Sequence, residues 1–538
     1  MPTAASVRRA ERFLTDEEAW ARRALTRASL AWWTASLSGR RGDYQRMERA
    51  DRAVNRHYSR TAAYQRLLRL LESAETDPLT RRRLQRQLLA YRSKQAPIEM
   101  LDRITRAEAD VQETYSTFRA QLDGHPASDN ELEDVLRASR DSDRVKATWE
   151  ARKQIGPVVA DDLRRLAHLR NEAARAIGFP DFWHAQLLLD ELDPESLIHT
   201  LEQVESATRQ PFESMKAGLD RHLAERFNVG EGDLRPWHYG DPFFQETPEV
   251  FAPPADPLYA ERDVVGLAAE TYRQLGFRNI DAILARSDLY PRAGKNQHAY
   301  AVDIDREGDV RTFLNVEANA RWMNTLLHEL GHGIYQDGID RTELPYDLRD
   351  DPQGFVNEGF AMFCEQPTKH PAWLTEMVGL TSSEATRLAP QLAAQDTASL
   401  LAFVRWCLTI VHFERAFYAD PDGDLNQVWW DLEERYQHVP RPEDRDAPDW
   451  ATKVHVATAP VYYQKYLLGR LFSAQLTGKM DADLGGWWEA RPRSGDSIKR
   501  ELFMPGARYA WLELVERVTG QPLGVESLAA AVAWPPAA

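Results

Sequence analysis

The chain has 538 residues, of which 43% are hydrophobic and 28% are charged, and its formal net charge is −16. This composition is normal for a soluble globular protein, and the chain is long enough to bury a sizeable core. The acidic balance argues against nucleic acid or an anionic membrane as a partner. We therefore expect neither a nucleic-acid-binding nor a membrane-surface protein.

The number of cysteines and the lengths of the apolar segments indicate the cellular compartment in which the protein is expected. The chain has only two cysteines, Cys364 and Cys407, which is too few for a disulfide framework and fits a reducing compartment. The first 20 residues lack the apolar core of a secretory signal, and no run approaches the ~18 apolar residues of a membrane span. The sequence therefore predicts a cytoplasmic protein.

Helical patterns dominate the chain. Residues 16–230 predict one helix after another, the first with Thr15 as its N-cap. Two alternating stretches within 296–317 flank a turn and predict a β-hairpin. Helices are expected to resume at Ala320 and to continue nearly to the end. The pattern indicates a mainly α protein with one small β-sheet, and no repeat or linker divides it.

The segment "NTLLHELGHGIYQDG", residues 324–338, carries the clearest chemical signal. His328 and His332 are four residues apart, so a helix would present both rings on one face toward a single ion. Glu329 lies next to His328 and could act as a general base toward a water on that ion. This H-E-x-x-H pattern is typical of zinc hydrolases.

A catalytic zinc usually has three protein ligands and one open position. The extended motif that supplies a third histidine would need Gly at 335 and His at 338, where this chain has Tyr335 and Gly338. A glutamate from a later helix is the remaining common solution. Glu358, 26 residues beyond His332, is assigned as the third ligand, with Glu365 as support behind the ligands. The reverse assignment of these two glutamates stays open.

Several ordered segments resemble the M2 metallopeptidases, the family of angiotensin-converting enzyme and its soluble bacterial relatives. The segments with this resemblance are "LRNEAARAIGF" (169–179), "QHAYAVDI" (297–304), "HELGH" (328–332), the Glu358 segment, "FERAFYADPDGDLNQVWWDL" (413–432) and "APDWATKVHVATAPVYYQKYLLGRLFSAQL" (447–476). The resemblance is good over about 140–515 and looser in the N-terminal helices.

The resemblance implies a fold and a domain organisation. The fold would be a large, bilobed, helical peptidase of the gluzincin type with a deep central cleft. Residues 1–538 would form a single peptidase domain. About 1–130 would be an N-terminal helical lid, and about 140–515 the catalytic region.

The resemblance also implies roles for individual residues. His328, His332 and Glu358 would hold one zinc ion per chain, and Glu329 would activate the water. His455 and Tyr466 match the residues that stabilise the oxyanion, a role that suits an imidazole and a phenol. The residues implied to bind substrate are His298, the backbone of Ala299, Lys453 and Tyr462.

Some positions depart from the family pattern. The spacing from His455 to Tyr466 is one residue longer than in the animal enzymes. The glutamine that would join Lys453 at the peptide carboxylate has no clear equivalent, and the nearest segment, "LRPWHYGDPF" (234–243), offers Trp237, His238 and Tyr239 instead.

Two further departures concern the chloride site and the metal ligands. The arginine expected to bind an activating chloride is replaced by Gln464-Lys465, so we expect no chloride dependence. Met362 occupies the place of an acidic residue four positions after the glutamate ligand.

Three functions remain after this sequence analysis. The first is a zinc metallopeptidase of the peptidyl dipeptidase type that cleaves short peptides near the C-terminus. The second is the same hydrolytic machinery acting on a small-molecule amide in specialised metabolism. The third is a non-catalytic helical binding protein with a structural metal or none, against which Glu329, His455 and Tyr466 argue. The sequence leaves open the substrate, the cleavage register, the oligomeric state, the extent of cleft opening and whether the metal is zinc or another divalent ion.

Overall fold

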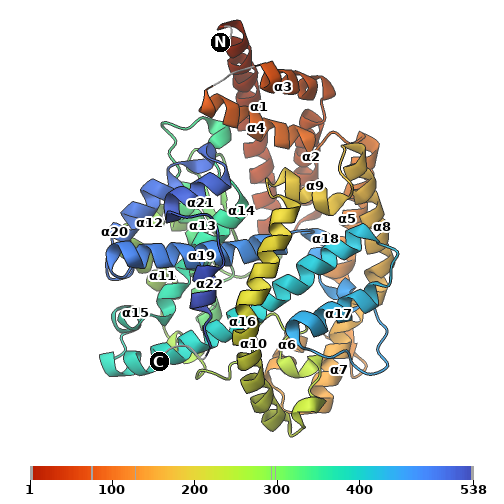
Figure 1. Ribbon diagram of the computed structural model, residues 1–538, viewed down its shortest axis with the longest axis vertical. Coiled ribbons are helices and arrows are strands. Elements are labelled where there is room, and N and C mark those ends of the chain that lie inside the picture. Colours follow the sequence, from red (N-terminus) through yellow and green to blue (C-terminus); the bar gives the residue numbers. More distant parts are fainter. Residues whose placement is uncertain (1–3, 74–76, 128, 293, 297, 535–538) are drawn as a thin grey trace. The chain divides into compact units, whose positions relative to one another are not determined.

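The computed structural model describes the chain except residues 1–3, 74–76, 128, 293, 297 and 535–538. By its internal contacts the chain divides into two compact units. Unit 1 comprises Met1–Gln95, Ala255–Thr386 and Leu468–Gly524, and unit 2 comprises Ala96–Pro254, Arg387–Leu467 and Val525–Ala538. The mainly helical class predicted from the sequence is confirmed (Figure 1).

Unit 1 contains the N-terminal helices and the helix that carries the H-E-x-x-H motif. Its α-helices are α1 (Ala4–Ser38), α2 (Arg41–Tyr58), α3 (Thr61–Ser73), α4 (Pro78–Arg92), α11 (Val264–Gln274), α12 (Ile280–Arg286), α13 (Ala320–Asp337), α14 (Gly354–Cys364), α15 (Pro371–Trp373), α20 (Arg493–Ile498) and α21 (Trp511–Thr519). Its strands are β3 (Tyr300–Asp303) and β4 (Val310–Phe313), and its short 3-10 and π turns are η3 (Asp256–Leu258), η4 (Tyr346–Leu348), η5 (Gln366–Lys369), η6 (Leu374–Val378), η8 (Lys499–Phe503) and η9 (Gly506–Arg508).

Unit 2 contains the long helices of the middle of the chain. Its α-helices are α5 (Ile98–Thr117), α6 (Asp129–Ala138), α7 (Ser142–Lys153), α8 (Ile155–Ala176), α9 (Phe182–Leu189), α10 (Pro194–Phe227), α17 (Leu425–Gln437), α18 (His455–Thr458) and α22 (Glu526–Ala531). Its strands are β1 (Ala120–Leu122) and β2 (His125–Ala127), and its 3-10 turns are η1 (Glu231–Asp233), η2 (Pro236–Tyr239) and η7 (Asp449–Thr452). Helices α16 (Ser382–Ala419) and α19 (Tyr463–Leu484) contain points where the chain passes between the units.

The predicted hairpin ahead of the histidine helix is confirmed. Strands β3 and β4 pair antiparallel, with Tyr300 opposite Phe313 and Asp303 opposite Val310. The stacked rings of Tyr300 and Phe313, 4.8 Å between centroids, pack with Trp33 of α1. The hairpin therefore anchors α1 as well as leading into α13, which begins at Ala320 as expected.

A second small sheet corrects the expectation of a single one. Strands β1 and β2 pair antiparallel around Asp123 and Gly124, which have φ angles of 54° and 78°. An Asp-Gly pair with positive φ at both positions is the turn that a tight hairpin favours. The Asp-Gly dipeptide was the available sequence signal for this hairpin, inside a stretch that was predicted to contain one helix after another.

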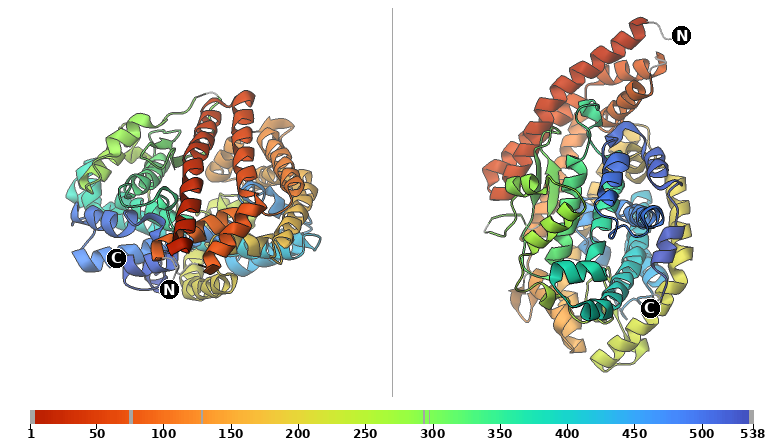
Figure 2. Two further views of the ribbon diagram at one scale, coloured as in Figure 1. Left: turned by 90° about the horizontal axis from the view of Figure 1, so that it is seen from above. Right: turned by 90° about the vertical axis from the view of Figure 1, so that its left-hand side faces the viewer.

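Helix α1 begins earlier than predicted. It starts at Ala4 and runs through Thr15, which is not an N-cap because its hydroxyl donates to the Glu11 carbonyl within the helix at 2.9 Å. Trp20 of α1 stacks on His57 of α2 with 3.4 Å between ring centroids, and the two helices lie side by side (Figure 2).

Ion pairs tie the N-terminal helices to the rest of unit 1. Arg83 of α4 lies 2.8 Å from Asp347 and 3.0 Å from Glu18, and Arg86 lies 3.6 Å from Asp350. Asp347 and Asp350 belong to the stretch that connects α13 to α14. These two helices carry the predicted zinc ligands, so the N-terminal helices contact the segment that joins them.

One described helix, α16, is long and apolar enough to cross a membrane by length and composition. In its most apolar stretch, 67% of the residues are buried within the protein. A core helix of a soluble protein passes the same test, so this is weak evidence for a membrane span. Cys364 and Cys407 are both buried and form no disulfide.

Candidate metal centre and substrate-binding residues

Helix α13 places the H-E-x-x-H motif. Asn319 caps its first turn by accepting from the Trp322 amide at 2.8 Å, and its apolar side, including Leu326 and Leu330, is fully buried. Gly331 lets α13 approach its neighbours closely, because a Cβ there would lie 3.2 Å from the Ala361 Cα of α14. The close packing of α13 on α14 brings the motif next to Glu358.

The structure brings His328, His332 and Glu358 together. The two Nε2 atoms lie 3.1 Å apart, and a carboxylate oxygen of Glu358 lies 3.5 Å from His328 Nε2 and 3.7 Å from His332 Nε2. All three candidate ligand atoms lie within 4.8 Å of one another. Three such donors around one point make the only three-residue group of this kind in the described part of the chain.

The other nitrogen of each ring is held by a hydrogen-bond acceptor. His328 Nδ1 lies 2.7 Å from Glu365 Oε1, and His332 Nδ1 lies 2.8 Å from Asn357 Oδ1. The Asn357 amide in turn donates to Asp351 at 3.2 Å, which orients its oxygen toward His332. An acceptor at each Nδ1 requires a proton on that atom, which leaves Nε2 as the ring atom that faces the candidate metal position.

The donor set fits a divalent cation of the zinc type. Two ring nitrogens that face each other at 3.1 Å repel as lone pairs unless a proton or a metal ion lies between them. Two imidazole nitrogens and one carboxylate oxygen form the common three-ligand set of catalytic zinc sites. The geometry supports zinc at this point.

Glu358 and Glu365 lie on opposite sides of the His328 ring. Glu358 faces Nε2, whereas Glu365 faces Nδ1 and also contacts Arg470 at 3.3 Å. Burial raises the pKa of Glu365, but Arg470 and His328 oppose this effect and hold the pKa at about 2. Glu365 is therefore a carboxylate that orients His328, and the geometry favours Glu358 as the ligand. Met362, in contrast, packs in the core.

Glu329 follows His328 on α13 and is partly buried. Burial raises its pKa above the ordinary value, and the nearby His328 and His332 oppose that effect. A raised pKa brings a carboxylate closer to the strength a general base needs. No described residue pairs with Glu329 by a hydrogen bond or an ion pair, so its carboxylate is available to a ligand of the site.

His298 and Ala299 lie just before β3. His298 is exposed and Ala299 is half-buried, and the His298 amide donates to Asn296 at 2.9 Å. In the described part of the chain β3 pairs only with β4, so its other edge keeps unpaired backbone groups. An extended peptide could bind along such an edge. Whether His298 and Ala299 align a substrate stays a prediction.

The remaining predicted residues lie in unit 2 or at its end. His455 begins α18, and its ring lies 5.2 Å from that of Tyr463. Tyr462 immediately precedes α19 and Tyr466 lies on the first turn of that helix, with 5.1 Å between their rings. The zinc ligands belong to unit 1, and the predicted part of His455 and Tyr466 in zinc chemistry stays a prediction.

Lys453 has a partner that sequence reasoning missed. Its ammonium donates to Gln245 Oε1 at 2.8 Å and lies over the rings of Phe243 and Trp406, at 4.9 and 5.2 Å. Burial lowers its pKa to about 8, although Asp241 opposes this effect. A buried ammonium held by an amide and aromatic rings can receive a carboxylate.

Gln245 is positioned by its neighbours. Asp241 accepts from the Gln245 side-chain amide at 3.1 Å, which turns the amide oxygen toward Lys453. Gln245 lies just past the segment in which a glutamine was sought. The three side chains named there, Trp237, His238 and Tyr239, are buried in other contacts, such as the Tyr239 hydroxyl bound to Asp220 at 3.0 Å. Gln245 is thus a glutamine beside Lys453 that the sequence analysis did not name, and its part in binding a peptide carboxylate is a prediction.

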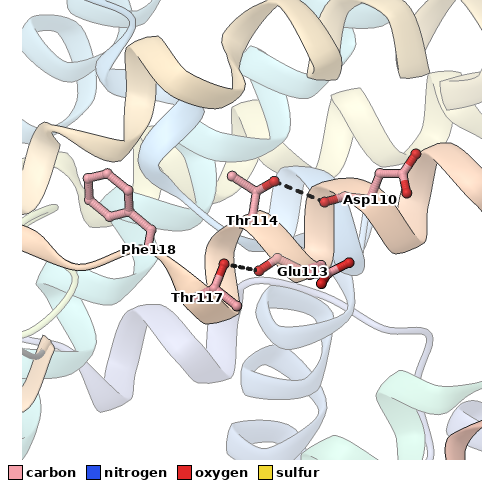
Figure 3. Close-up of a pocket in the computed structure, with 5 residues that line it drawn as sticks. All are labelled: Asp110, Glu113, Thr114, Thr117 and Phe118. Carbon is pink, nitrogen blue, oxygen red and sulfur yellow. Dashed lines mark hydrogen bonds between the residues drawn. The ribbon is translucent and has the colours of Figure 1, made fainter. Parts of the chain in front are cut away.

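A surface pocket among the described residues lies away from the candidate metal centre. Asp110, Glu113, Thr114, Thr117 and Phe118, on the last turns of α5 and just beyond them, line a hollow of about 380 Å³ (Figure 3). The threonine hydroxyls donate to backbone carbonyls of their own helix. The pocket contains none of the predicted site residues and is a surface hollow along one helix.

Comparisons with known proteins bear on the family. The sequence model of the angiotensin-converting enzyme family, Peptidase M2, matches residues 4–233, and that of peptidase family M3 matches residues 281–533. The chain is similar to M2 and M3 metallopeptidases. The M3 match contains all three candidate zinc ligands, and the M2 match covers the N-terminal helices, where only a looser resemblance was expected.

Individual proteins similar to this chain include angiotensin-converting enzymes. Angiotensin-converting enzyme of Mesocricetus auratus is 22% identical over 477 residues, which cover 79% of this chain and 35% of that protein. The enzyme of Oryctolagus cuniculus is 21% identical over 472 residues, with the same coverage of both chains. The chain thus spans about a third of the length of the relatives it matches. The resemblance to M2 peptidases is confirmed, and the two families indicate a zinc metallopeptidase.

Proposed function

We propose that the protein is a zinc-dependent peptidase that removes short fragments from the C-terminus of short peptides, as a peptidyl dipeptidase does. The observation that carries this proposal is the convergence of His328, His332 and Glu358, with both Nδ1 atoms engaged and both Nε2 atoms facing one point. The family matches and the names of the curated relatives support it.

His328, His332 and Glu358 would hold the zinc ion. Zinc bound by these residues supplies a Lewis acid that polarises a carbonyl and activates water. Glu329 would accept a proton from the attacking water and donate it to the leaving amine. His455 and Tyr466 would donate hydrogen bonds to the negative charge that develops on the carbonyl oxygen.

In the proposed function, Lys453 and Gln245 are the main substrate-binding residues. Both would bind the terminal carboxylate of a peptide, with Tyr462 beside them, while the edge of β3 would align the peptide backbone. The hydrogen bond from Lys453 to Gln245 supports a short peptide rather than a small-molecule amide as substrate, because it supplies a glutamine beside the lysine. The short-peptide function is therefore the one that the residues support best, in a protein expected to be cytoplasmic.

The test uses matched peptides with free and amidated C-termini and reads the products by mass. Preferential cleavage of the free peptides near their C-terminus would support the proposal. Equal cleavage of both would favour an endopeptidase, and no cleavage by a protein that binds one zinc would move the assignment to a small amide. A protein that binds no zinc would contradict the metallopeptidase assignment itself.

A further inference from the structure

The turn between α18 and α19 has an unusual backbone conformation. His455 lies at the start of α18, Tyr466 lies in α19, and residues 459–462 connect the two helices. Val461, in this turn, has a φ angle of 55°. A β-branched residue rarely adopts this left-handed conformation, because its side chain collides with the backbone. Other contacts must therefore hold the turn.

Two buried side chains satisfy the backbone of Val461. Glu414 of α16 accepts from the Val461 amide at 2.8 Å, and Gln464 donates to the Val461 carbonyl at 2.6 Å. Glu414 is 2% exposed and Gln464 is 1% exposed. Because water does not reach these groups, loss of Glu414 would leave a buried amide without its acceptor.

The other end of the segment is held in a similar way. The buried guanidinium of Arg170 donates to the carbonyls of Val456 at 3.4 Å and Ala457 at 2.7 Å, and also bonds Glu108 at 2.8 Å. Arg170 therefore fixes α18, which begins with His455, while Glu414 fixes the turn that follows. The two contacts together define the path from His455 to α19.

A positive φ angle at a large apolar residue, as at Val461, is uncommon among the described residues. The described residues other than glycine with positive φ are Asp123, Glu191, Asn228, Phe244, Arg306, His438, Asp444 and Val461. Only Phe244 and Val461 among them are large and apolar. Phe244 immediately precedes Gln245, and Val461 immediately precedes Tyr462, so both precede a proposed substrate contact. Strained backbone that persists in a folded protein is concentrated at functional sites.

We propose that Glu414 is a positioning residue. By holding the left-handed turn at Val461, it sets the orientation of the His455 side chain relative to the Tyr466 side chain. The stretch from His455 to Tyr466 contains this turn, so the turn gives the chain a defined path between the two residues. The inference rests on the proposed function, in which His455 and Tyr466 donate hydrogen bonds to the oxyanion. Glu414 itself touches no substrate.

The test compares Glu414→Ala, Glu414→Gln and Thr409→Val with the wild-type zinc enzyme. Burial raises the pKa of Glu414 to about 8, so the carboxyl is mostly protonated at pH 7 and glutamine reproduces its shape and acceptor. We expect Glu414→Ala to lower kcat about 10- to 100-fold with KM within twofold, because misplaced oxyanion donors weaken the transition state alone. Glu414→Gln should restore kcat.

Thr409 is the matched control. It lies on the same helix, is fully buried and donates to the Arg405 carbonyl at 3.1 Å, so Thr409→Val loses a buried hydrogen bond away from the turn. Its kcat should equal that of the wild type. Gln464→Met provides a second test if Glu414→Ala fails to fold, and should also lower kcat at unchanged KM.

Folded, zinc-loaded Glu414→Ala or Gln464→Met with wild-type kcat would overturn the positioning role. An equal loss of kcat in Thr409→Val would also overturn the positioning role, because the loss of any buried hydrogen bond in α16 would then lower kcat. If the wild-type protein itself cleaves no peptide, the proposed function fails, and the positioning role falls with it.

Discussion

The Nε2 atoms of His328 and His332 lie 3.1 Å apart while acceptors occupy both Nδ1 atoms. Asn357 holds His332, and Glu365, paired with Arg470, holds His328. Both Nε2 atoms therefore face the same point. This arrangement organises a metal site in advance and supplies a direct set of tests.

Loss of the Asn357 acceptor should weaken metal binding without removing a ligand. Asn357→Ala frees the His332 ring to rotate, and partners of this kind typically contribute 10- to 100-fold to metal affinity. Competition with a chromogenic chelator measures the change. Asn279→Ala is the control, because Asn279 is an exposed asparagine that bonds Asp337 at 2.6 Å. Equal affinities in wild type and Asn357→Ala would contradict the proposed orientation.

Zinc removal should destabilise the protein. Without the ion, the facing Nε2 atoms of His328 and His332 and the Glu358 carboxylate lose their common partner. A ligand at 100 times its Kd stabilises the folded state by about 2.7 kcal/mol. We expect a chelator to lower the thermal midpoint of the wild type and to leave His332→Ala, which already lacks a ligand, nearly unchanged. A midpoint of the wild type that does not respond would argue against a resident metal.

Lys453 should discriminate between free and blocked peptides. Lys453→Met keeps much of the side-chain volume but removes the ammonium, so kcat/KM for peptides with a free C-terminus should fall about 10- to 100-fold, as expected for a lost charged hydrogen bond. Amidated peptides should be cleaved as before. Gln245→Leu should act in the same direction but more weakly, since it removes a neutral partner. An equal fall for both peptide classes would show that Lys453 serves the fold rather than the carboxylate.

Stability should depend on pH through Glu414. Burial raises its pKa from 4.5 to about 8, although the Val461 amide and Arg170 oppose this effect. A carboxyl with a higher pKa in the folded state stabilises the fold fully below about pH 4.5, and this contribution is lost as the pH rises through about 8. The wild type should therefore lose stability relative to Glu414→Gln between pH 5 and 8.

The expected difference is at most about 1.4 kcal/mol per pH unit, the value for one whole proton. Glu433, whose pKa burial also raises to about 8, is present in both proteins and cancels from the comparison. Urea unfolding at several pH values measures the difference. A difference that is constant from pH 5 to 8 would show that Glu414 does not titrate as its burial requires.

Much of the metal centre could be predicted because its signal is local. The four-residue spacing of His328 and His332 fixes their common face once the helix forms, and the alternating pattern around the β3–β4 turn fixed that hairpin. Glu365 was found from helical spacing, although its contact with Arg470 was not. That contact joins residues 105 positions apart, and no local pattern encodes it.

What could not be predicted depends on tertiary contacts. Gln245 was missed because its role depends on Lys453, 208 positions away, and on the local turn at Phe244. Thr15 resembled an N-cap, yet its hydroxyl also bonds well inside a helix, and the residues before it continue α1. The left-handed conformation of Val461 has no signature in its own side chain, because it is imposed by Glu414 from another helix.

The most direct measurement compares the wild type with Glu329→Gln, both with quantified zinc, on a library of short peptides read by mass. Glu343→Gln is the control, as an exposed glutamate beyond the end of α13. Glu329 is proposed as the base and not as a ligand, so we expect one zinc per chain in all three proteins and loss of C-terminal fragments from peptides with the wild type and Glu343→Gln alone. Cleavage by Glu329→Gln at the wild-type rate, or its failure to bind zinc, would contradict the assignment.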